Sequence, residues 1–129
     1  MNWRYTDPRA GRFTIRLAEE GGELLGYAVL RRSRRNAYIA DLLTLPNRDD
    51  VLLALIQGAL AHFGELGEGA VRCWMARHLA YRQTLQQCGF RAIRQVHGLS
   101  LGPHGTTNVD FLADERAAVH FCVGDTDLV

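Results

Sequence analysis

Asp41 is the side chain of this sequence that is best suited to acid–base chemistry. It lies in the apolar run of residues 37–45, between Ala40 and Leu42. Burial raises the pKa of a carboxylic acid, and a carboxylate with a raised pKa can take a proton from an amine. The alternative is a structural carboxylate bonded to a neighbouring backbone group or to an arginine, because buried carboxylates are usually paired. Either interpretation requires a strand that carries Asp41 inward.

Other common catalytic groups are missing or badly spaced. All fifteen basic residues are arginine, which excludes a phosphate-loop lysine, a Schiff-base lysine and a Ser–Lys pair. Neither serine, Ser33 or Ser100, lies in a Gly-x-Ser-x-Gly turn. No two of the five histidines have the i, i+4 spacing of a helical metal site. We therefore expect no metal centre.

The cysteines lie in apolar surroundings and are too few and too far apart for a disulfide framework. We expect them to be small, buried hydrophobic residues of a reducing cytoplasm. They are Cys73, Cys88 and Cys122.

Charge and length argue for one domain that spans residues 1–129, with an arm at 1–12 and an acidic tail at 124–129. The net charge of +1 gives no reason to expect nucleic acid, and no apolar run is long enough to span a membrane. Four arginines at 31, 32, 34 and 35 can meet a phosphate or form a solvated hairpin tip. In the tail, Asp125 and Asp127 are either metal ligands or part of a mobile end.

Hydrophobic periodicity predicts an α/β (strictly α+β) fold with a twisted, mixed, mainly antiparallel sheet and two main helices. A three-stranded meander leads into a β–α–β crossover, which should be right-handed. Asn47 or Asp49 should cap the first helix. The expected order is β-β-β-α-β-α-β-β, with strands at 13–19, 24–30, 37–45, 70–76, 90–101 and 119–123 and turns at 20–23 and 31–36. The first helix should follow its cap, carry an apolar repeat from Val51 and end at about Glu65, and the second should span about 78–88.

Three segments resemble the GNAT superfamily of acyl-coenzyme A-dependent N-acyltransferases. Residues 23–30, ELLGYAVL, are similar to its central strand, and residues 37–46, AYIADLLTLP, look like the strand that lines the pantetheine arm. Residues 78–90, which end in Gly89-Phe90, resemble its late helix. The resemblance covers about residues 3–101 and implies transfer of an acyl group from acetyl-CoA or another acyl-CoA to a small-molecule or peptide amine.

This resemblance also implies roles for particular residues. The pantetheine arm would pair with the backbone around Leu42, Leu43 and Thr44. Asp41 would act as general base. The family's acidic tyrosine corresponds to Leu85 here, and Tyr81, one turn earlier, would replace it as general acid. Arg48 would help to hold the diphosphate.

Two departures from the family leave a second interpretation open. The family's glycine-rich diphosphate loop corresponds to residues 49–54, DDVLLA, so Asp49 and Asp50 stand where an anion would bind. The family's first strand and two helices have no counterpart before residue 13, which leaves a sheet edge open to pairing. The alternative is therefore an inactive GNAT-like binding or assembly module, and we expect a homodimer or a partner domain at that edge.

Overall fold

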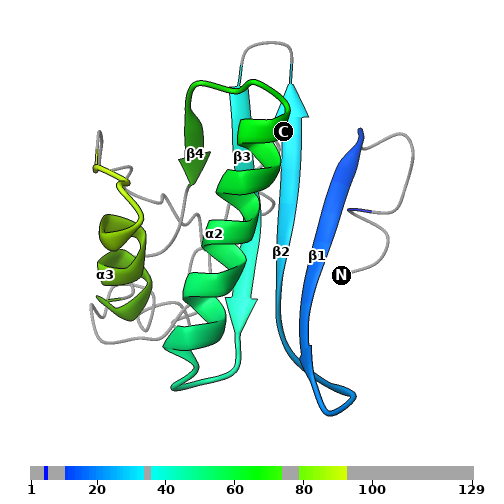
Figure 1. The fold of residues 1–129 in the computed structure, drawn as a ribbon, viewed down its shortest axis with the longest axis vertical. Helices are drawn as coiled ribbons and strands as arrows, with labels where there is room; N and C mark the ends of the chain where they lie inside the picture. Colours follow the sequence, from blue (N-terminus) through cyan, green and yellow to red (C-terminus); the bar gives the residue numbers. More distant parts are fainter. Residues whose placement is uncertain (1–4, 6–10, 34–35, 74–78, 93–129) are drawn as a thin grey trace, which may run out of the picture.

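The computed structural model describes residues 5, 11–33, 36–73 and 79–92. Four strands form one open sheet in the order β1-β2-β3-β4 (Figure 1). The first three pair antiparallel, and β4 pairs parallel to β3. This confirms the expected mixed sheet with its antiparallel part first. The strands are β1 (Phe13–Glu20), β2 (Glu23–Ser33), β3 (Asn36–Thr44) and β4 (Val71–Cys73).

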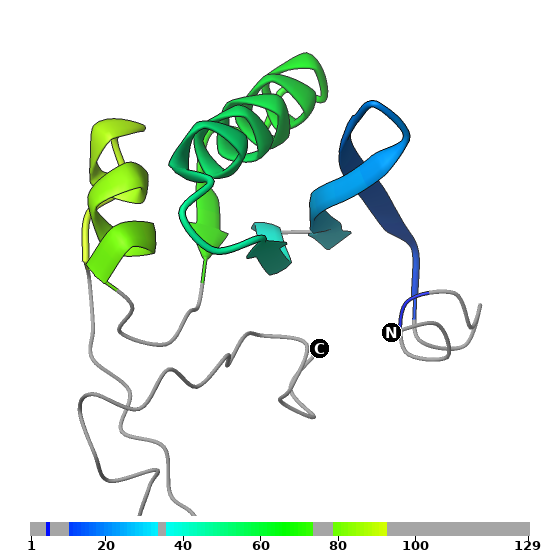
Figure 2. The ribbon, with the colours of Figure 1, turned by 90° about the horizontal axis from the view of Figure 1, so that it is seen from below.

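Helix α2 (Asp49–Glu65) covers one face of the sheet, and α3 (Leu79–Gln87) lies beside it on the β4 side (Figures 1 and 2). Neither helix is long and apolar enough to cross a membrane. Gly89 and Phe90 end α3 in a Schellman motif, in which the Phe90 N–H donates to the Leu85 carbonyl and the Gly89 N–H to the Gln86 carbonyl. The expected stop after α3 is confirmed.

The predicted cap of α2 was wrong. The N-cap residue is Arg48, which makes no side-chain cap hydrogen bond. Asn47, one of the two expected caps, has a φ of 60° and instead turns the chain between β3 and α2. The acidic residues of the first helical turn are Asp49 and Asp50, as the favourable interaction of carboxylates with a helix N-terminus predicts.

The turns of the meander match the sequence in one place and differ in another. Gly21 and Gly22 have φ values of 60° and 85°, the conformation that a two-residue hairpin turn requires. The expected turn at 31–36 was too long, because Arg31 and Arg32 belong to β2. Arg31 lies over the Phe13 ring, with 5.6 Å to its centroid, and Arg32 forms an ion pair with Glu68.

Some expected segments lie partly or wholly outside the described residues. The predicted strands at 90–101 and 119–123 and the tail at 124–129 fall mostly or entirely in 93–129. Residues 90–92, where the first of these strands should begin, form no regular structure. Strand β4 is described only as far as Cys73.

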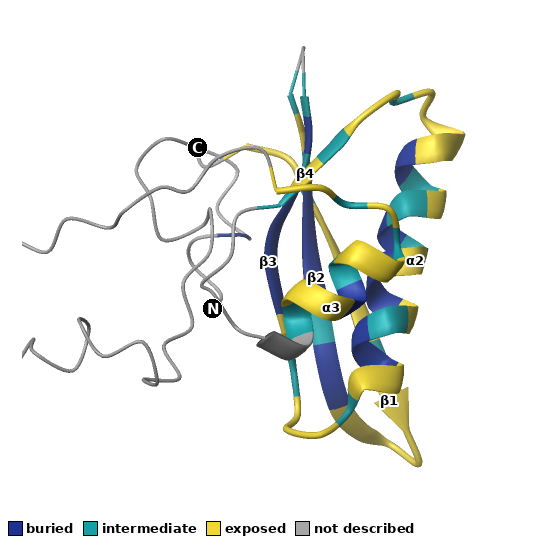
Figure 3. Ribbon diagram, turned by 90° about the vertical axis from the view of Figure 1, so that its left-hand side faces the viewer, coloured by how far each residue is buried: buried dark blue, intermediate teal, exposed yellow. Residues whose placement is uncertain are grey.

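The main core lies between the sheet and α2, and a smaller one lies on the opposite face of the sheet (Figure 3). Cross-strand partners of a sheet share a face, so the register assigns each strand residue to one core or the other. The main core includes Ala28, Leu30, Ile39, Leu42, Leu52, Ile56 and Phe63. The second core consists of Tyr5, Val29 and Ala40, with Phe13 and Tyr27 packed against them.

A β-bulge interrupts β3 in the middle of the strand. Val29 pairs with Asp41 and the next residue, Leu30, pairs with Ile39, so Ala40 is the extra residue of the bulge. Asp41 therefore follows Ala40 onto the face of the second core, and Leu42 returns to the main core. The bulge thus places Ala40 and Asp41 side by side on the face of the second core.

Candidate functional site

Asp41 is buried, with 7% of its surface exposed, and both of its carboxylate oxygens accept hydrogen bonds. The hydroxyl groups of Tyr5 and Tyr27 each donate to Asp41 Oδ2 at 3.2 Å. The backbone N–H of Leu42 donates to Asp41 Oδ1 at 2.8 Å. Hydrogen bonds of this kind offset the cost of removing a carboxylate from water. Asp41 is thus a bonded carboxylate, as the structural interpretation expected, and Tyr27, being half-buried, links it toward the surface.

Alternate amides of β3 point to opposite sides of the strand. The Leu45 N–H donates to the Leu25 carbonyl of β2 at 2.8 Å. By alternation, the amides of Leu42 and Thr44 point away from β2, toward the side on which β4 pairs with β3 earlier in the strand. Among the residues that the structure describes, the Leu42 amide donates to Asp41 and pairs with no neighbouring strand.

Tyr81 binds the second of these amides, that of Thr44. Its hydroxyl oxygen accepts a hydrogen bond from the Thr44 N–H at 3.0 Å and lies 3.3 Å from Thr44 Oγ1. We call residues Leu42–Thr44 the capped edge, since their two outward amides are held by the side chains of Asp41 and Tyr81. Within the described residues, ladder pairing of β3 with β4 ends at Ile39.

The two candidate catalytic residues reach this edge from opposite faces of the sheet. Asp41 contacts Tyr5 and Tyr27 of the second core. Tyr81 is carried by α3 and packs against the main core. The structure therefore brings Asp41, Leu42, Thr44 and Tyr81 together. Leu43 differs from its neighbours, because its amide faces Tyr27 of β2 and its side chain is exposed.

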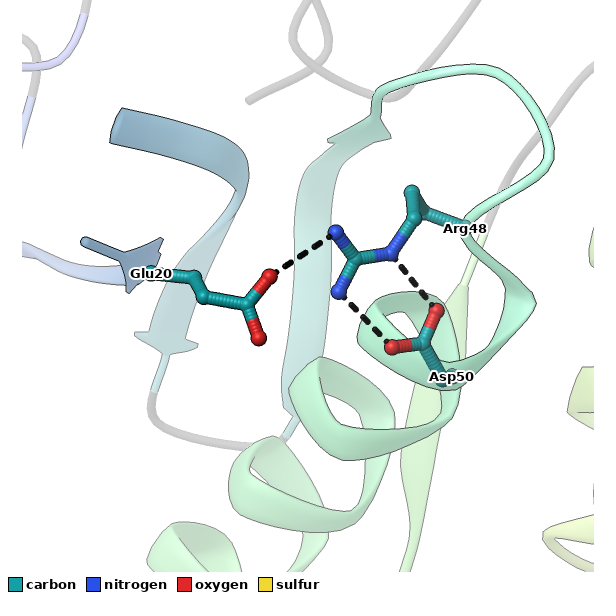
Figure 4. Close-up of polar contacts among 3 residues, drawn as sticks. All are labelled: Glu20, Arg48 and Asp50. Carbon is teal, nitrogen blue, oxygen red and sulfur yellow. Dashed lines mark hydrogen bonds and ion pairs between the residues drawn. The ribbon is translucent and has the colours of Figure 1, made fainter. Parts of the chain in front are cut away.

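Arg48 is fully engaged at the start of α2 (Figure 4). Its Nε and Nη2 donate to the two carboxylate oxygens of Asp50 at 2.9 and 2.8 Å, and its Nη1 donates to Glu20 at 3.3 Å. Hydrogen bonding to Arg48 and to the backbone N–H groups of Val51 and Asp50 lowers the pKa of Asp50 to about 2. The fork geometry of arginine, well suited to phosphate, is used here on a carboxylate.

The diphosphate of an acyl-CoA does not fit this helix start. With Asp49, Asp50 and Glu20 opposed by Arg48 alone, the four side chains carry a formal charge of −2. The backbone amides that would bind an anion at a helix N-terminus already face the Asp50 carboxylate. A diphosphate would have to displace the Asp50 carboxylate from both Arg48 and the amides, against like charge.

The cysteines of the described residues take the structural role that their surroundings predict. Cys73 and Cys88 pack against the main core but are half-buried rather than fully buried. Burial raises the pKa of the Cys88 thiol, so the thiolate form is disfavoured. Cys122 lies outside the described residues. In the described part of the chain, no three His, Cys, Asp or Glu side chains are grouped as a metal ion would require.

Tyr5 and Tyr27 are the residues of this site that sequence reasoning missed. Tyr27 could have been found from its register, since odd-numbered residues of β2 such as Tyr27 and Val29 share the face to which the bulge turns Asp41. Tyr5 has no such signal, because it lies outside the sheet. Compared with known proteins, the chain matches no family model, no curated protein and no solved structure.

Proposed function

We propose that the capped edge is an acyl-transfer site of GNAT-like type, at which an amine attacks a thioester. The observation that carries the proposal is the placement of Asp41 and Tyr81, from opposite faces of the sheet, at two successive outward amides of one strand. Opposite faces give a donor and an acceptor separate approaches to one reacting carbon, as direct transfer in a ternary complex requires.

On the side of the second core, Asp41 is the proton acceptor and Tyr27 connects it to the amine. The attacking amine gives a proton to the Tyr27 oxygen while Tyr27 passes its own proton to Asp41 Oδ2, which lies 3.2 Å away. Tyr5 donates to the same oxygen but is buried, so its role is to hold Asp41. Proton transfer of this kind contributes a rate factor of about 10²–10⁴.

Tyr81 completes the reaction on the side of α3. As the C–S bond breaks, Tyr81 gives its hydroxyl proton to the departing thiolate, and the amide product and a free thiol result. The Thr44 N–H, which donates to the Tyr81 oxygen at 3.0 Å, stabilises the negative charge that develops there. Solvent returns the proton from Asp41 to Tyr81 after products leave.

The test is acyl transfer itself, under the reducing conditions of the cytoplasm, in which we place this chain. Acetyl thioesters are incubated with a panel of small amines and amine-bearing peptides, and the amide product is measured by mass spectrometry. We expect Tyr81→Phe to lower kcat about 100-fold. Tyr38→Phe serves as the matched control, because Tyr38 is a half-buried tyrosine of β3 outside the capped edge. Equal rates for Tyr81→Phe and wild type would remove Tyr81 from the reaction.

A second function, assembly, is favoured by the exposed surface of β1. Among the described residues, β1 pairs only with β2, and Ile15 and Leu17 of β1 are 37% and 54% exposed. We propose that this strand pairs antiparallel with β1 of a second copy. A two-fold axis near its middle brings Arg12 of one copy toward Glu19 and Glu20 of the other, so the edge is self-complementary in charge.

Light scattering coupled to size exclusion tests the assembly. We expect a dimer at tens of micromolar, and we expect Leu17→Lys to weaken it by more than about tenfold, because an edge lysine opposes strand pairing. Leu66→Lys is the control, since Leu66 is 41% exposed at the end of α2. A wild-type chain that stays monomeric at high concentration contradicts this second function and leaves the acyl-transfer proposal untouched.

A further inference from the structure

The negative charge at the start of α2 repels the diphosphate of an acyl-CoA. All three guanidinium nitrogens of Arg48 already donate to carboxylates, two of them to Asp50 and one to Glu20 (Figure 4). Asp49 adds a further negative charge in the same helical turn. Two like charges about 4 Å apart cost on the order of 1 kcal/mol even in water, which is roughly a fivefold loss of affinity per pair.

The capped edge, in contrast, is chemically suited to the neutral arm of a thioester. Its outward Leu42 amide is a backbone donor that an amide-containing arm can engage in place of Asp41 Oδ1, while the Thr44 amide stays with Tyr81. Leu43 within this edge and Leu45 beside it are 39% and 43% exposed. Their side chains offer apolar surface against which a flexible chain of methylene groups can pack. Nothing in these contacts requires a phosphate.

We propose that the thioester donor of this site is recognised through its pantetheine-like arm alone, so that the nucleotide diphosphate contributes no binding. This rests on the proposed acyl-transfer function and specifies its donor: an acyl-pantetheine thioester serves at least as well as acetyl-CoA. The arm supplies the thiol leaving group in every case, so the chemistry of transfer is unchanged.

Two donors that share the same acetyl thioester separate the possibilities. Steady-state transfer to one amine is measured with acetyl-CoA and with S-acetyl-pantetheine. We expect kcat/KM with S-acetyl-pantetheine to match or exceed that with acetyl-CoA, by up to about tenfold at low salt, and no inhibition by millimolar 3′-phosphoadenosine 5′-diphosphate. The double variant Asp49→Asn/Asp50→Asn should raise kcat/KM for acetyl-CoA about tenfold at low salt and leave that for S-acetyl-pantetheine unchanged, since it removes two negative charges.

The outcomes distinguish this inference from the function on which it rests. A preference for acetyl-CoA of thirtyfold or more, or inhibition by the nucleotide, overturns the inference and leaves acyl transfer standing. An unchanged donor ratio in the double variant, with folding verified by its thermal transition, also counts against it. Transfer from neither thioester refutes the proposed function itself.

Discussion

Replacing Asp41 with alanine is expected to lower the free energy of unfolding by about 3 kcal/mol and to abolish acyl transfer. The substitution removes the acceptor of three hydrogen bonds, from Tyr5, Tyr27 and the Leu42 amide. Buried donors left without a partner each cost roughly 1–3 kcal/mol, and a rearranged second core recovers part of that. Urea denaturation followed by circular dichroism measures the loss. The control is Asp49→Ala, whose exposed side chain is worth less than about 0.5 kcal/mol.

The more conservative Asp41→Asn separates structure from catalysis. Asparagine keeps an oxygen for the Leu42 amide and has nearly the same volume, so we expect the free energy of unfolding to fall by only about 1 kcal/mol. It cannot accept a proton at pH 7, so kcat should fall at least 100-fold.

Tyr27→Phe and Tyr5→Phe each remove one hydroxyl from the same Asp41 oxygen. Only Tyr27→Phe should slow transfer strongly, and equal rates for the two would contradict the relay.

Substituting Gly26 by alanine is expected to destabilise the protein by about 2 kcal/mol and to disturb the capped edge. A Cβ atom at this position would lie 2.7 Å from the Leu43 carbonyl oxygen and 3.0 Å from Thr44 Cγ2. The backbone of β3 must therefore move, at a cost typical of overpacking in a core. Because Thr44 is displaced, its N–H should lose the hydrogen bond to Tyr81, and its amide should exchange faster with solvent.

Gly58→Ala provides a matched control of opposite sign. Gly58 lies within α2, and a Cβ atom there would have only Arg16 Cδ near it, at 4.0 Å. Alanine favours a helix interior over glycine by about 1 kcal/mol, so this variant should be more stable than wild type. Two Gly→Ala changes would then shift the urea midpoint in opposite directions. A stable Gly26→Ala variant with a protected Thr44 amide would show that β3 yields to the added atom.

The local pattern of the sequence predicted the meander and α2 well, because each of these elements is specified by its own residues. The alternation in β1, the Gly21-Gly22 turn and the apolar repeat of α2 need no distant partner to be recognised. The turn at 31–36 was overextended because a run of arginines looks like a solvated tip, whereas Arg31 and Arg32 are held in β2 by Phe13 and Glu68. Such contacts are long-range and leave no local trace.

The candidate site was predictable only in part for the same reason. Asp41 and Tyr81 can be chosen by residue type and resemblance, but 40 residues separate them. The position of Tyr81 at Thr44, two residues from the Leu42 amide that Asp41 holds, depends on how α3 packs beside α2. The bulge at Ala40 has no signature in the sequence, since alanine fits either a regular strand or a bulge. The ion pair of Arg48 with Asp50, in contrast, joins residues two positions apart. The sequence alone therefore indicated that Asp49 and Asp50 lie at the start of α2.

The bulge has a consequence for chain length. With Ala40 as the single unpaired residue, β3 is one residue longer than the stretch of β2 beside it. Without Ala40, Ile39 and Asp41 would be adjacent and would still face opposite sides of the sheet. Every remaining side chain of β3 would therefore keep its present face. What β3 would lose is the added bend that a bulge gives a strand. One residue in β3 therefore sets the direction in which the strand continues past the bulge, and with it the position of the capped edge.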